Sequence, residues 1–282
     1  MEPSIRRLTH DDIPQAMRLK DAAGWNQTAA DWQIFISSNS AGCFAAEHDG
    51  RLIGTVTTIV YEERFAWIGM LLVDLQFRGR GIGRALLEHA IRHLDERGIA
   101  CAKLDATPQG KPLYQKLGFV AEYEIERWAL PRPPGQENAA ALAPAEGDLA
   151  AALKLDREIF GADRGSVLRR VARSAPEFVQ IARGGNEIAG YTFGRHGSLA
   201  DHLGPWVARE KATASMQLDQ FLRHSTRELL FVDCVLENSW AAPLARARGF
   251  ELSRPLTRMF RGENRYPGKP GYTCAGLGPE FG

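Results

Sequence analysis

The chain has 282 residues, of which 44% are hydrophobic and 24% are charged, so it can form one large or two ordinary domains with a full core. Its 35 basic and 34 acidic residues leave a net charge of +1, which argues against a dedicated nucleic-acid-binding or membrane-surface protein. Four scattered cysteines, no C-x-x-C pair, no signal-like N-terminus and no apolar run of membrane length predict a reduced, cytoplasmic protein without a disulfide framework or a thiolate zinc site.

A helix and three strands are predicted for the start of the chain. The stretch IRRLTHDDIPQAMRL (5–19) combines a polar turn with a short amphipathic helix. FAAEHDGRLIGTVTT (44–58) has two apolar segments on either side of a Gly-containing turn, a pattern typical of two strands. RFAWIGMLLV (64–73) is mostly apolar and rich in bulky residues, which indicates a central strand.

A longer helix is predicted to begin directly after Gly81. Its apolar stripe has helical spacing and consists of Ile82, Leu86, Leu87, Ala90, Ile91 and Leu94. Arg97-Gly98 is a typical helix end, and IACAKLDA (99–106) reads as the next strand. His89 and His93 are four residues apart on this helix, as metal ligands can be, but no third ligand lies nearby in the sequence. We therefore expect surface histidines and no metal site.

The turn before this helix, RGRGIG (78–83), has the composition of a phosphate-binding loop. The first N–H groups of a helix have no partners within it, and the helix dipole places about half a positive charge there. Glycines let the main chain curl around an anion. A Walker loop is excluded because G-K-[ST] is absent, and a dinucleotide fingerprint because Arg84 stands where Gly or Ala is needed. A flexible turn with solvated arginines remains an alternative.

The first half ends in a leucine-led segment that closes on Gly-Phe, LYQKLGF (113–119), and in a strand, EYEIERWAL (122–130). The next stretch, PRPPGQENAAALAPAEG (131–147), has the composition of a linker. The second half repeats the order of the first, with LARARGF (244–250) and LSRPLTRMF (252–260) in the places of its last two elements.

This repeat predicts two mixed α/β domains of one fold. We place the first domain at 1–130, the linker at 131–143 and the second domain at 144–282. The Gly- and Pro-rich tail, RYPGKPGYTCAGLGPEFG (265–282), is expected to lie extended over a surface.

Two motifs of the first half together resemble those of a known family. VDLQFRGRGIGRALL (73–87) is similar to the acyl-CoA-binding motif Q/R-x-x-G-x-G/A of the GNAT superfamily of N-acetyltransferases, with Arg78, Gly81 and Gly83 at the defined positions. Downstream, PLYQKLGF (112–119) resembles the family's Tyr-bearing helix that ends at Gly-Phe. Two motifs in this order and at this spacing are much more specific than either alone.

The resemblance covers residues 4–130 strongly and 142–261 as a weaker copy. It implies two tandem GNAT-like domains, each a mixed, mostly antiparallel sheet flanked by helices, an arrangement similar to that of tandem GNAT proteins of bacteria. One departure is Leu75, where many members have Pro; the loop amides are retained, so we expect little effect.

The resemblance also implies acetyl-CoA as cosubstrate. In this family the central strand splays from its neighbour, and the pantetheine arm would pair with it along Leu71, Leu72 and Val73. The diphosphate is expected on the glycine-rich turn, made of Arg78, Gly79, Arg80, Gly81, Ile82, Gly83 and Arg84. A backbone N–H of the central strand would polarise the thioester carbonyl, and Tyr114 would be the acid that protonates the leaving thiolate.

The implied reaction is direct attack of a primary amine on the thioester, which requires removal of a proton from the ammonium form. The sequence does not identify the base. Asp105 lies at a strand end beside the slot, Glu62 and Glu63 lie in a turn, and His48 lies in a hairpin. A chain of water molecules is an equal alternative.

The acceptor is expected near the loop AGWNQTAADW (23–32). Aromatic walls with a few polar groups are typical of small-molecule sites. Trp25 and Asn26 are therefore predicted to contact the acceptor, and Trp32 to belong to the core.

The second half lacks both motifs. DHLGPWVA (201–208) matches the central strand, but no R-x-x-G-x-G follows it and the loop is shorter. Ala245 stands where Tyr114 stands in the first copy. We therefore expect the second domain not to catalyse acetyl transfer.

The sequence thus predicts an acetyl-CoA-dependent N-acetyltransferase for a small-molecule amine, acting as a monomer or homodimer with no nucleic-acid or membrane partner. A non-catalytic acyl-CoA sensor is one alternative. An enzyme that modifies a protein or peptide amine is another, and it would need an open groove.

Overall fold

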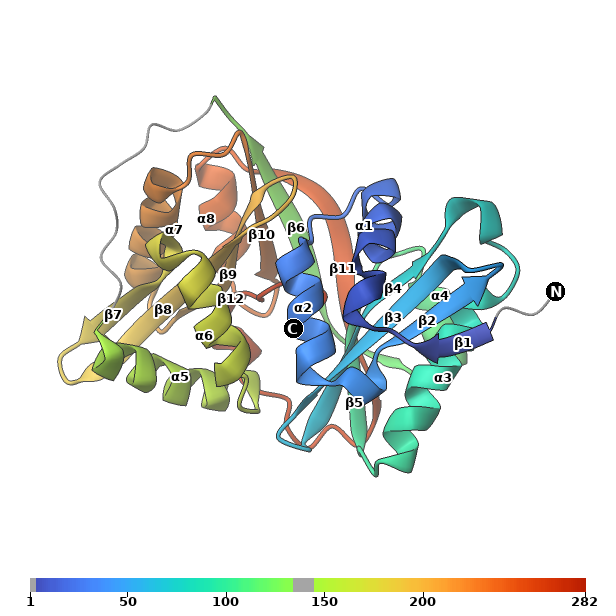
Figure 1. Cartoon of the computed structure of the whole chain (residues 1–282). Helices are drawn as coiled ribbons and strands as arrows, with labels where there is room; N and C mark the ends of the chain where they lie inside the picture. The colour runs from blue at the N-terminus through green and yellow to red at the C-terminus, as the bar shows by residue number, and fades with distance from the viewer. Residues whose placement is uncertain (1–3, 134–144) are drawn as a thin grey trace.

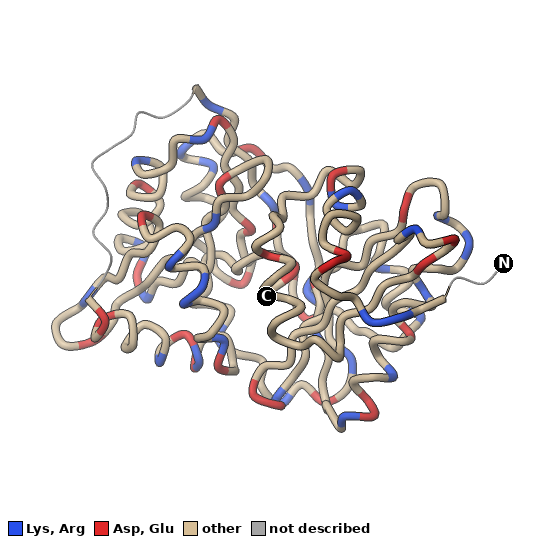
Figure 2. The backbone as a smooth tube through the Cα atoms, viewed as in Figure 1, with Lys and Arg blue, Asp and Glu red and all other residues tan. Residues whose placement is uncertain are grey.

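The structure is a computed structural model that describes residues 4–133 and 145–282, so residues 134–143 of the predicted linker lie outside the described residues. Two lobes lie side by side, and two long strands, β6 (Val120–Pro131) and β11 (Glu251–Gly262), run between them (Figure 1). Acidic and basic residues are interspersed over both lobes (Figure 2). No helix within the described ranges combines the length and the apolar character that a bilayer crossing needs.

The first half contains its elements in the predicted order. Its other strands are β1 (Ser4–Arg7), β2 (Phe44–His48), β3 (Arg51–Tyr61), β4 (Phe65–Val73) and β5 (Cys101–Ala106). Its α-helices are α1 (Ile13–Ala22), α2 (Ala29–Ser38), α3 (Ile82–Glu96) and α4 (Lys111–Lys116). Short 3-10 turns are η1 (His10–Asp12), η2 (Ser40–Gly42) and η3 (Leu75–Phe77).

The second half repeats this series without a counterpart of β1. Its other strands are β7 (Gln180–Gly184), β8 (Glu187–His196), β9 (Asp201–Ala208), β10 (Leu229–Val235) and β12 (Thr273–Ala275). Its helices are α5 (Glu146–Phe160), α6 (Gly165–Ser174), α7 (Lys211–His224) and α8 (Ala241–Ala247), with the 3-10 turns η4 (Pro176–Phe178) and η5 (Pro270–Tyr272).

All described strands join one 12-stranded sheet in the order β1-β2-β3-β4-β5-β11-β6-β10-β12-β9-β8-β7. The pairs β4–β5 and β9–β10 are parallel, and the other pairs are antiparallel. Helices flank the sheet in both lobes (Figure 1). The predicted fold class, tandem units of mixed and mostly antiparallel sheet with flanking helices, is confirmed.

The last strands of the two halves change places. β11, from the second half, lies between β5 and β6, and β6, from the first half, lies between β11 and β10. At the centre, Ile125 pairs with Leu256, and these two residues follow Phe119 and Phe250 at the same spacing in their halves. The pairing therefore has an approximate twofold relation, and each half completes the sheet of the other.

Two buried ion pairs cross between the halves at this exchange. Arg127 on β6 donates two hydrogen bonds to Asp233 on β10, both 2.7 Å long. Arg258 on β11 does the same to Asp105 on β5, at 2.8 and 2.9 Å. Bidentate pairs of this kind combine strength with fixed geometry, so they hold the exchanged strands in register.

The helix after the glycine-rich turn packs as its sequence pattern predicts. α3 begins at Ile82, and the six residues of the predicted stripe are those of its residues that are buried. They pack against apolar side chains of the sheet, among them Phe44, Ile53, Val56 and Leu104. This packing fixes the start of α3 at the end of β4.

The expectation for the C-terminal tail is wrong in part. Instead of lying over a surface, the tail enters the sheet as β12, between β10 and β9. The end of the tail lies deep in the protein. Its buried side chains include Cys274, Ala275, Leu277, Glu280 and Phe281. The physical reason is that β9 and β10 diverge, and their unpaired backbone groups need partners.

Candidate active site

The glycine-rich turn at the start of α3 faces open space. Gly79 and Gly81 have φ values of 77° and 80°, in the left-handed region where only glycine is free of strain. No atom lies within 4 Å of the position that a Cβ would take at either residue. No side chain caps this helix start, so its first N–H groups are free to donate hydrogen bonds to a bound anion.

A groove of about 780 Å³ opens beside this turn. The predicted cofactor-binding residues that line it are Leu71, Leu72, Val73, Arg78, Gly79, Gly81, Ile82, Gly83 and Arg84. Arg80 turns aside, with its guanidinium over the Phe77 ring at 5.2 Å from the centroid. Tyr114 lines the same groove. The tertiary structure thus brings the two sequence motifs together.

The groove continues into a wedge between β4 and β5. These parallel strands pair only at Ala66 with Ala102 and at Trp67 with Lys103. Farther along, Met70 has a φ of 49°, and its carbonyl accepts a hydrogen bond of 2.8 Å from the Thr55 hydroxyl. This bulge and the divergence leave the later part of β4 without pairing to β5, so an extended ligand can occupy that edge.

Tyr114 lies on α4 at the junction of the groove with a second cavity. Its ring packs on Gly110, where a Cβ would lie 2.9 Å from the ring, and on Phe119, with centroids 6.0 Å apart. Burial raises the pKa of Tyr114 to about 12. The hydroxyl therefore stays protonated at any working pH.

The second cavity is small, about 50 Å³. It shares Trp25, Leu71, Asp105, Thr107, Tyr114 and Arg254 with the groove. Its remaining polar lining comes from both halves and the tail, as Asn26, Gln27, Arg127 and Glu280. A compound in this cavity would thus meet the groove at Tyr114 and Leu71.

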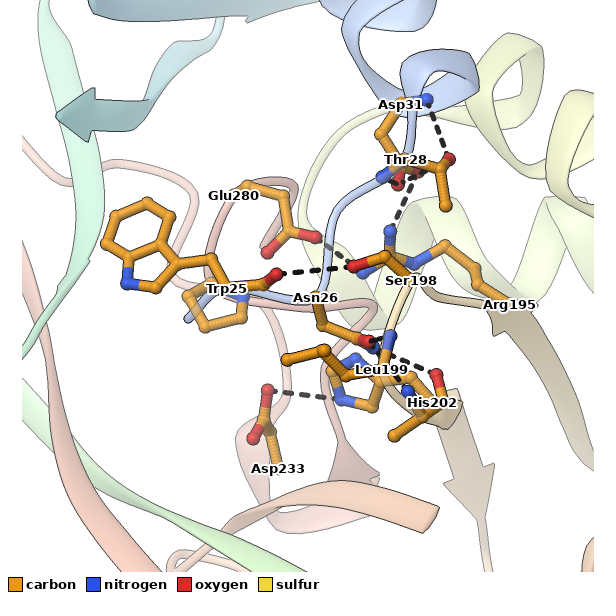
Figure 3. Close-up of polar contacts among 12 residues, drawn as sticks. Trp25, Asn26, Thr28, Asp31, Arg195, Ser198, Leu199, His202, Asp233 and Glu280 are labelled. Carbon is orange, nitrogen blue, oxygen red and sulfur yellow. Dashed lines mark hydrogen bonds and ion pairs between the residues drawn. The ribbon is translucent and has the colours of Figure 1, made fainter. Parts of the chain in front are cut away.

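Trp25 and Asn26, the predicted acceptor residues, both line the small cavity. Asn26 also bridges the two halves: its side-chain oxygen accepts from the backbone N–H groups of Leu199 and Ala200 at 2.9 Å, and its amide donates to the Ala200 carbonyl at 3.0 Å (Figure 3). Trp25 is half-buried, and Trp32 is fully buried in the core. Contact of Trp25 and Asn26 with an acceptor stays a prediction.

Asp105 lines both the groove and the small cavity. Burial raises the pKa of its carboxyl, and Arg258 opposes that rise. Because Arg258 occupies both carboxylate oxygens, this side chain is poorly placed to take a proton from an amine. The pairing with Arg258 instead gives Asp105 a structural role, because it joins β5 to the exchanged strand β11.

The other candidate bases lie away from the groove and the cavity. Glu62 binds Arg157 and the backbone N–H of Asp163, and Glu63 binds Arg97 at 2.9 Å. The His48 ring lies 5.6 Å from that of Phe77. None of the three lines the groove or the cavity.

His89 and His93 pack edge-on against Phe44, with centroids 4.4 and 5.5 Å apart. Burial lowers the pKa of both. Within residues 4–133 and 145–282, no group of three His, Cys, Asp or Glu side chains is arranged to hold a metal ion.

The second half has the same wedge, but there the described residues fill it. β9 and β10 pair in parallel from Asp201 to Leu203 on β9 and then diverge. β12 fills this space, because Ala275 pairs with Trp206 of β9 and with Cys234 of β10. α7 follows closely behind β9, and Ala245, the counterpart of Tyr114, is fully buried.

Among the residues of the small cavity that sequence reasoning missed are Gln27, Arg254 and Glu280. Gln27 lies next to the predicted pair in the sequence, so the loop itself was the available signal. Arg254 follows a register shift in β11, and Glu280 arrives from the far end of the chain. No local sequence pattern at Arg254 or Glu280 indicates that the residue lines the cavity.

Comparisons with known proteins agree with the tandem arrangement. A model described as "Acetyltransferase (GNAT) family" matches residues 7–119, and one described as "Acetyltransferase (GNAT) domain" matches residues 152–273. Holothin acyltransferase of Pseudoalteromonas sp. is 25% identical over 197 residues, covering 68% of this chain and 64% of that protein. The chain therefore spans less than two thirds of this relative.

Another relative matches over nearly its whole length. The ribosomal protein bS18-alanine N-acetyltransferase of Escherichia coli is 30% identical over 148 residues, covering 50% of this chain and 95% of that protein. A crystal structure from Pyrococcus horikoshii has a TM-score of 0.82 at 22% identity, covering 100% of this chain and 96% of that one. That similarity shows the shared fold.

Proposed function

The chain belongs to the GNAT acetyltransferase family, and from that premise we propose that it transfers an acetyl group from acetyl-CoA to a primary amine of a small molecule. The amine would attack the thioester directly. The observation that carries this proposal is the single groove that joins the glycine-rich start of α3, the free edge of β4 and Tyr114.

The groove residues fit acetyl-CoA by shape and chemistry. The space in front of Gly79 and Gly81 lets a diphosphate approach the amides of the turn, where the helix dipole favours negative charge. Arg78 and Arg84 line the groove beside these glycines and add positive charge. The unpaired edge of β4 suits the amide groups of a pantetheine arm.

Acetyl-CoA supplies an activated acyl carbon and a thiolate leaving group. The backbone from Leu71 to Val73 would hold the arm in the manner of a neighbouring strand. An N–H group of β4 at the bulge near Met70 would stabilise the negative charge that develops on the carbonyl oxygen. These are positioning and electrostatic contributions that need no side-chain nucleophile.

Tyr114 is the proposed proton donor to the sulfur. A thiol has a pKa near 8.5, whereas burial holds the pKa of Tyr114 at about 12, so complete transfer of the phenol proton would be uphill by about 5 kcal/mol. The hydroxyl therefore acts by hydrogen-bonding the developing thiolate. The proton that finally resides on the thiol comes from the attacking amine through water, since Arg258 occupies both oxygens of Asp105, the candidate base that lines the junction.

A small acceptor is favoured over a protein because the acceptor side is a cavity of about 50 Å³ walled by Trp25 and by charged residues. An enclosed site of this kind suits a compact amine. The name of the holothin relative also points to a small molecule, whereas the Escherichia coli relative is named for a protein alanine. The size of the cavity supports the small-molecule acceptor in our proposal.

The domain assignment belongs to the same proposal. Residues 1–130 carry the catalytic groups, and 144–282 form a second unit that does not catalyse, because β12 occupies its wedge and Ala245 replaces the tyrosine. The exchange of β6 and β11 makes each unit depend on the other for its sheet. A monomeric or homodimeric state and a cytoplasmic location stay predictions from sequence.

The test has two parts on the full-length protein. Calorimetry with CoA is expected to give one site per chain, and an assay of thiol release with acetyl-CoA and a panel of primary amines is expected to show turnover. Binding of two CoA molecules, or of none, would overturn the site assignment. CoA binding without turnover on any amine would favour the sensor alternative.

A further inference from the structure

The C-terminal tail reaches the acceptor side of the active site after it leaves β12. The indole N–H of Trp67, on β4, donates to the carbonyl of Pro279 at 2.9 Å. The hydroxyl of Tyr61, at the end of β3, donates to the carbonyl of Phe281 at 2.9 Å. The residues on both sides of Glu280 are thus fixed to the first half.

Gly69 of β4 packs directly on the backbone of Glu280. A Cβ at position 69 would lie 2.9 Å from the Glu280 carbonyl oxygen and 3.1 Å from its Cα, so a larger residue would push the tail away. The next residue, Met70, begins the bulge where β4 offers its free edge. Glu280 is therefore held beside the part of β4 where the thioester is expected.

The carboxylate of Glu280 is buried, with 3% of the residue exposed, and yet is only half satisfied. One oxygen pairs with Arg195 (Figure 3), and the other, Oε2, has no hydrogen bond of standard geometry among the described residues. The Gln27 side chain is close enough to lower the pKa of the Glu280 carboxyl, but an amide adds no counter-charge. Arg195 also pairs with Asp31 at 2.8 Å. Two carboxylates thus share one guanidinium, so Glu280 has no ion-pair partner to itself.

The other positive charges at this cavity come from two arginines, and neither forms an ion pair with Glu280 among the described residues. Arg127 lines the cavity but is committed to Asp233 through two hydrogen bonds. Arg254 lines the groove as well as the cavity, and Glu280 acts on it electrostatically without a hydrogen bond between them. Glu280 lines the cavity alone. A buried carboxylate with a free oxygen calls for a cationic donor.

We propose that Glu280, delivered by the tail, recognises the acceptor by binding its ammonium group, so that alkyl amines that are cationic at neutral pH are selected over neutral compounds of the same shape. This inference rests on the proposed function. It also gives the second half a role, since that half anchors β12 in its own wedge and thereby presents Glu280 to the first half.

Glu280 binds the acceptor but is not its final base. Burial raises the pKa of Glu280, but Arg195 and other neighbours lower it by more. The carboxylate therefore holds a proton only weakly. The ammonium must lose its proton to water before attack. Glu280 therefore raises the local concentration of the amine and orients it.

The test compares matched probes on the full-length protein saturated with CoA. Calorimetry would use methylamine against methanol and ethylamine against ethanol, which are compact enough for the small cavity. We expect each amine to bind the unmodified protein at least about tenfold more tightly than its alcohol, as for a charge-assisted hydrogen bond. Glu280→Gln should abolish that preference and leave CoA affinity unchanged. Glu263→Gln is the control, because Glu263 is exposed and pairs with Arg265.

Two results would overturn the inference: no preference for the amines in the unmodified protein, or a preference that survives Glu280→Gln. If Glu280→Gln fails to fold, Glu280→Asp keeps the charge on a shorter arm and should retain a weakened preference; an undiminished preference there would count against the inference. If the unmodified protein did not bind CoA at all, the proposed function would be refuted. CoA binding without an amine preference would refute only the role of Glu280.

Discussion

The two halves form the same wedge between parallel strands and use it in opposite ways. In the first half, β4 and β5 part after Trp67 and Lys103, and the glycine-rich turn keeps the space open. In the second half, β9 and β10 part after Leu203 and Val232, and β12 pairs with both. Unpaired strand edges are costly inside a protein, so a wedge without a ligand has to be filled by the chain itself.

The segment that fills the second wedge also contributes to the first site. After β12 the tail continues to Glu280 in the acceptor cavity. The filling of the wedge in one half is therefore coupled to the completion of the cavity in the other. Variants in both halves test this difference.

The largest expected effect is on stability, at the two crossed ion pairs. Arg258→Ala leaves the buried Asp105 carboxylate without its partner, and we expect the free energy of unfolding to fall by about 3–5 kcal/mol. Arg127→Ala should cost less, because Asp233 keeps His202 at 3.2 Å. Denaturant unfolding of both variants measures the difference. Equal losses would show that His202 does not support Asp233.

The next effect is on turnover. Tyr114→Phe removes the proposed donor to the sulfur, and we expect kcat to fall about 100-fold, or about 2.7 kcal/mol. CoA affinity should not change, because the ring still packs on Phe119. Tyr272→Phe, at an exposed position of the tail, is the matched control. An unchanged kcat in Tyr114→Phe would remove the residue from the mechanism.

A smaller effect is expected from adding one side chain to the glycine-rich turn. Gly81→Val and Gly185→Val both place a side chain at a left-handed position with open space around it, at φ 80° and 65°. Each should lose about 1–3 kcal/mol of stability. Only Gly81→Val should also weaken CoA binding, by at least about tenfold, because it obstructs the amides. Calorimetry with equal losses for both variants would contradict the site.

The smallest effect concerns pH. Hydrogen bonds to Asp201 and Glu177 raise the pKa of His196, so its stabilising contribution is complete below the unfolded pKa of about 6.5 and is lost as pH rises through the folded pKa. His196→Gln should therefore destabilise more at pH 5.5 than at pH 8.5, within about 1 kcal/mol because the side chain is half exposed.

His93 in the first half should show the opposite sign. Burial lowers its pKa, so the folded state resists protonation, and stability declines as pH falls from about 6.5 toward the folded pKa. Relative to the unmodified protein, His93→Gln should be most favourable at pH 5.5. Unfolding free energies at the two pH values test both variants, and slopes of the same sign would contradict the assignment.

Much of the fold could be predicted from sequence patterns that span only a few neighbouring residues. The stripe on α3 and the glycines before it report on neighbours within a few residues, and the structure has them as predicted. Tyr114 and the turn met in one groove because each motif occupies a fixed place on its element. Asn26, which is predicted to contact the acceptor, lines the small cavity, but its contacts with Leu199 and Ala200 depend on the other half.

What the sequence determined by itself was the repeat, the order of elements and the loss of the phosphate turn in the second copy, because these depend on local propensity and composition. The tertiary structure alone decided which half each final strand completes and where the tail lies. β6 and β11 have nearly equivalent positions in their halves, so local pattern cannot tell an exchanged partner from its own. Only the sum of long-range pairing, crossed ion pairs and a wedge left to fill selects the arrangement that brings Glu280 to the site.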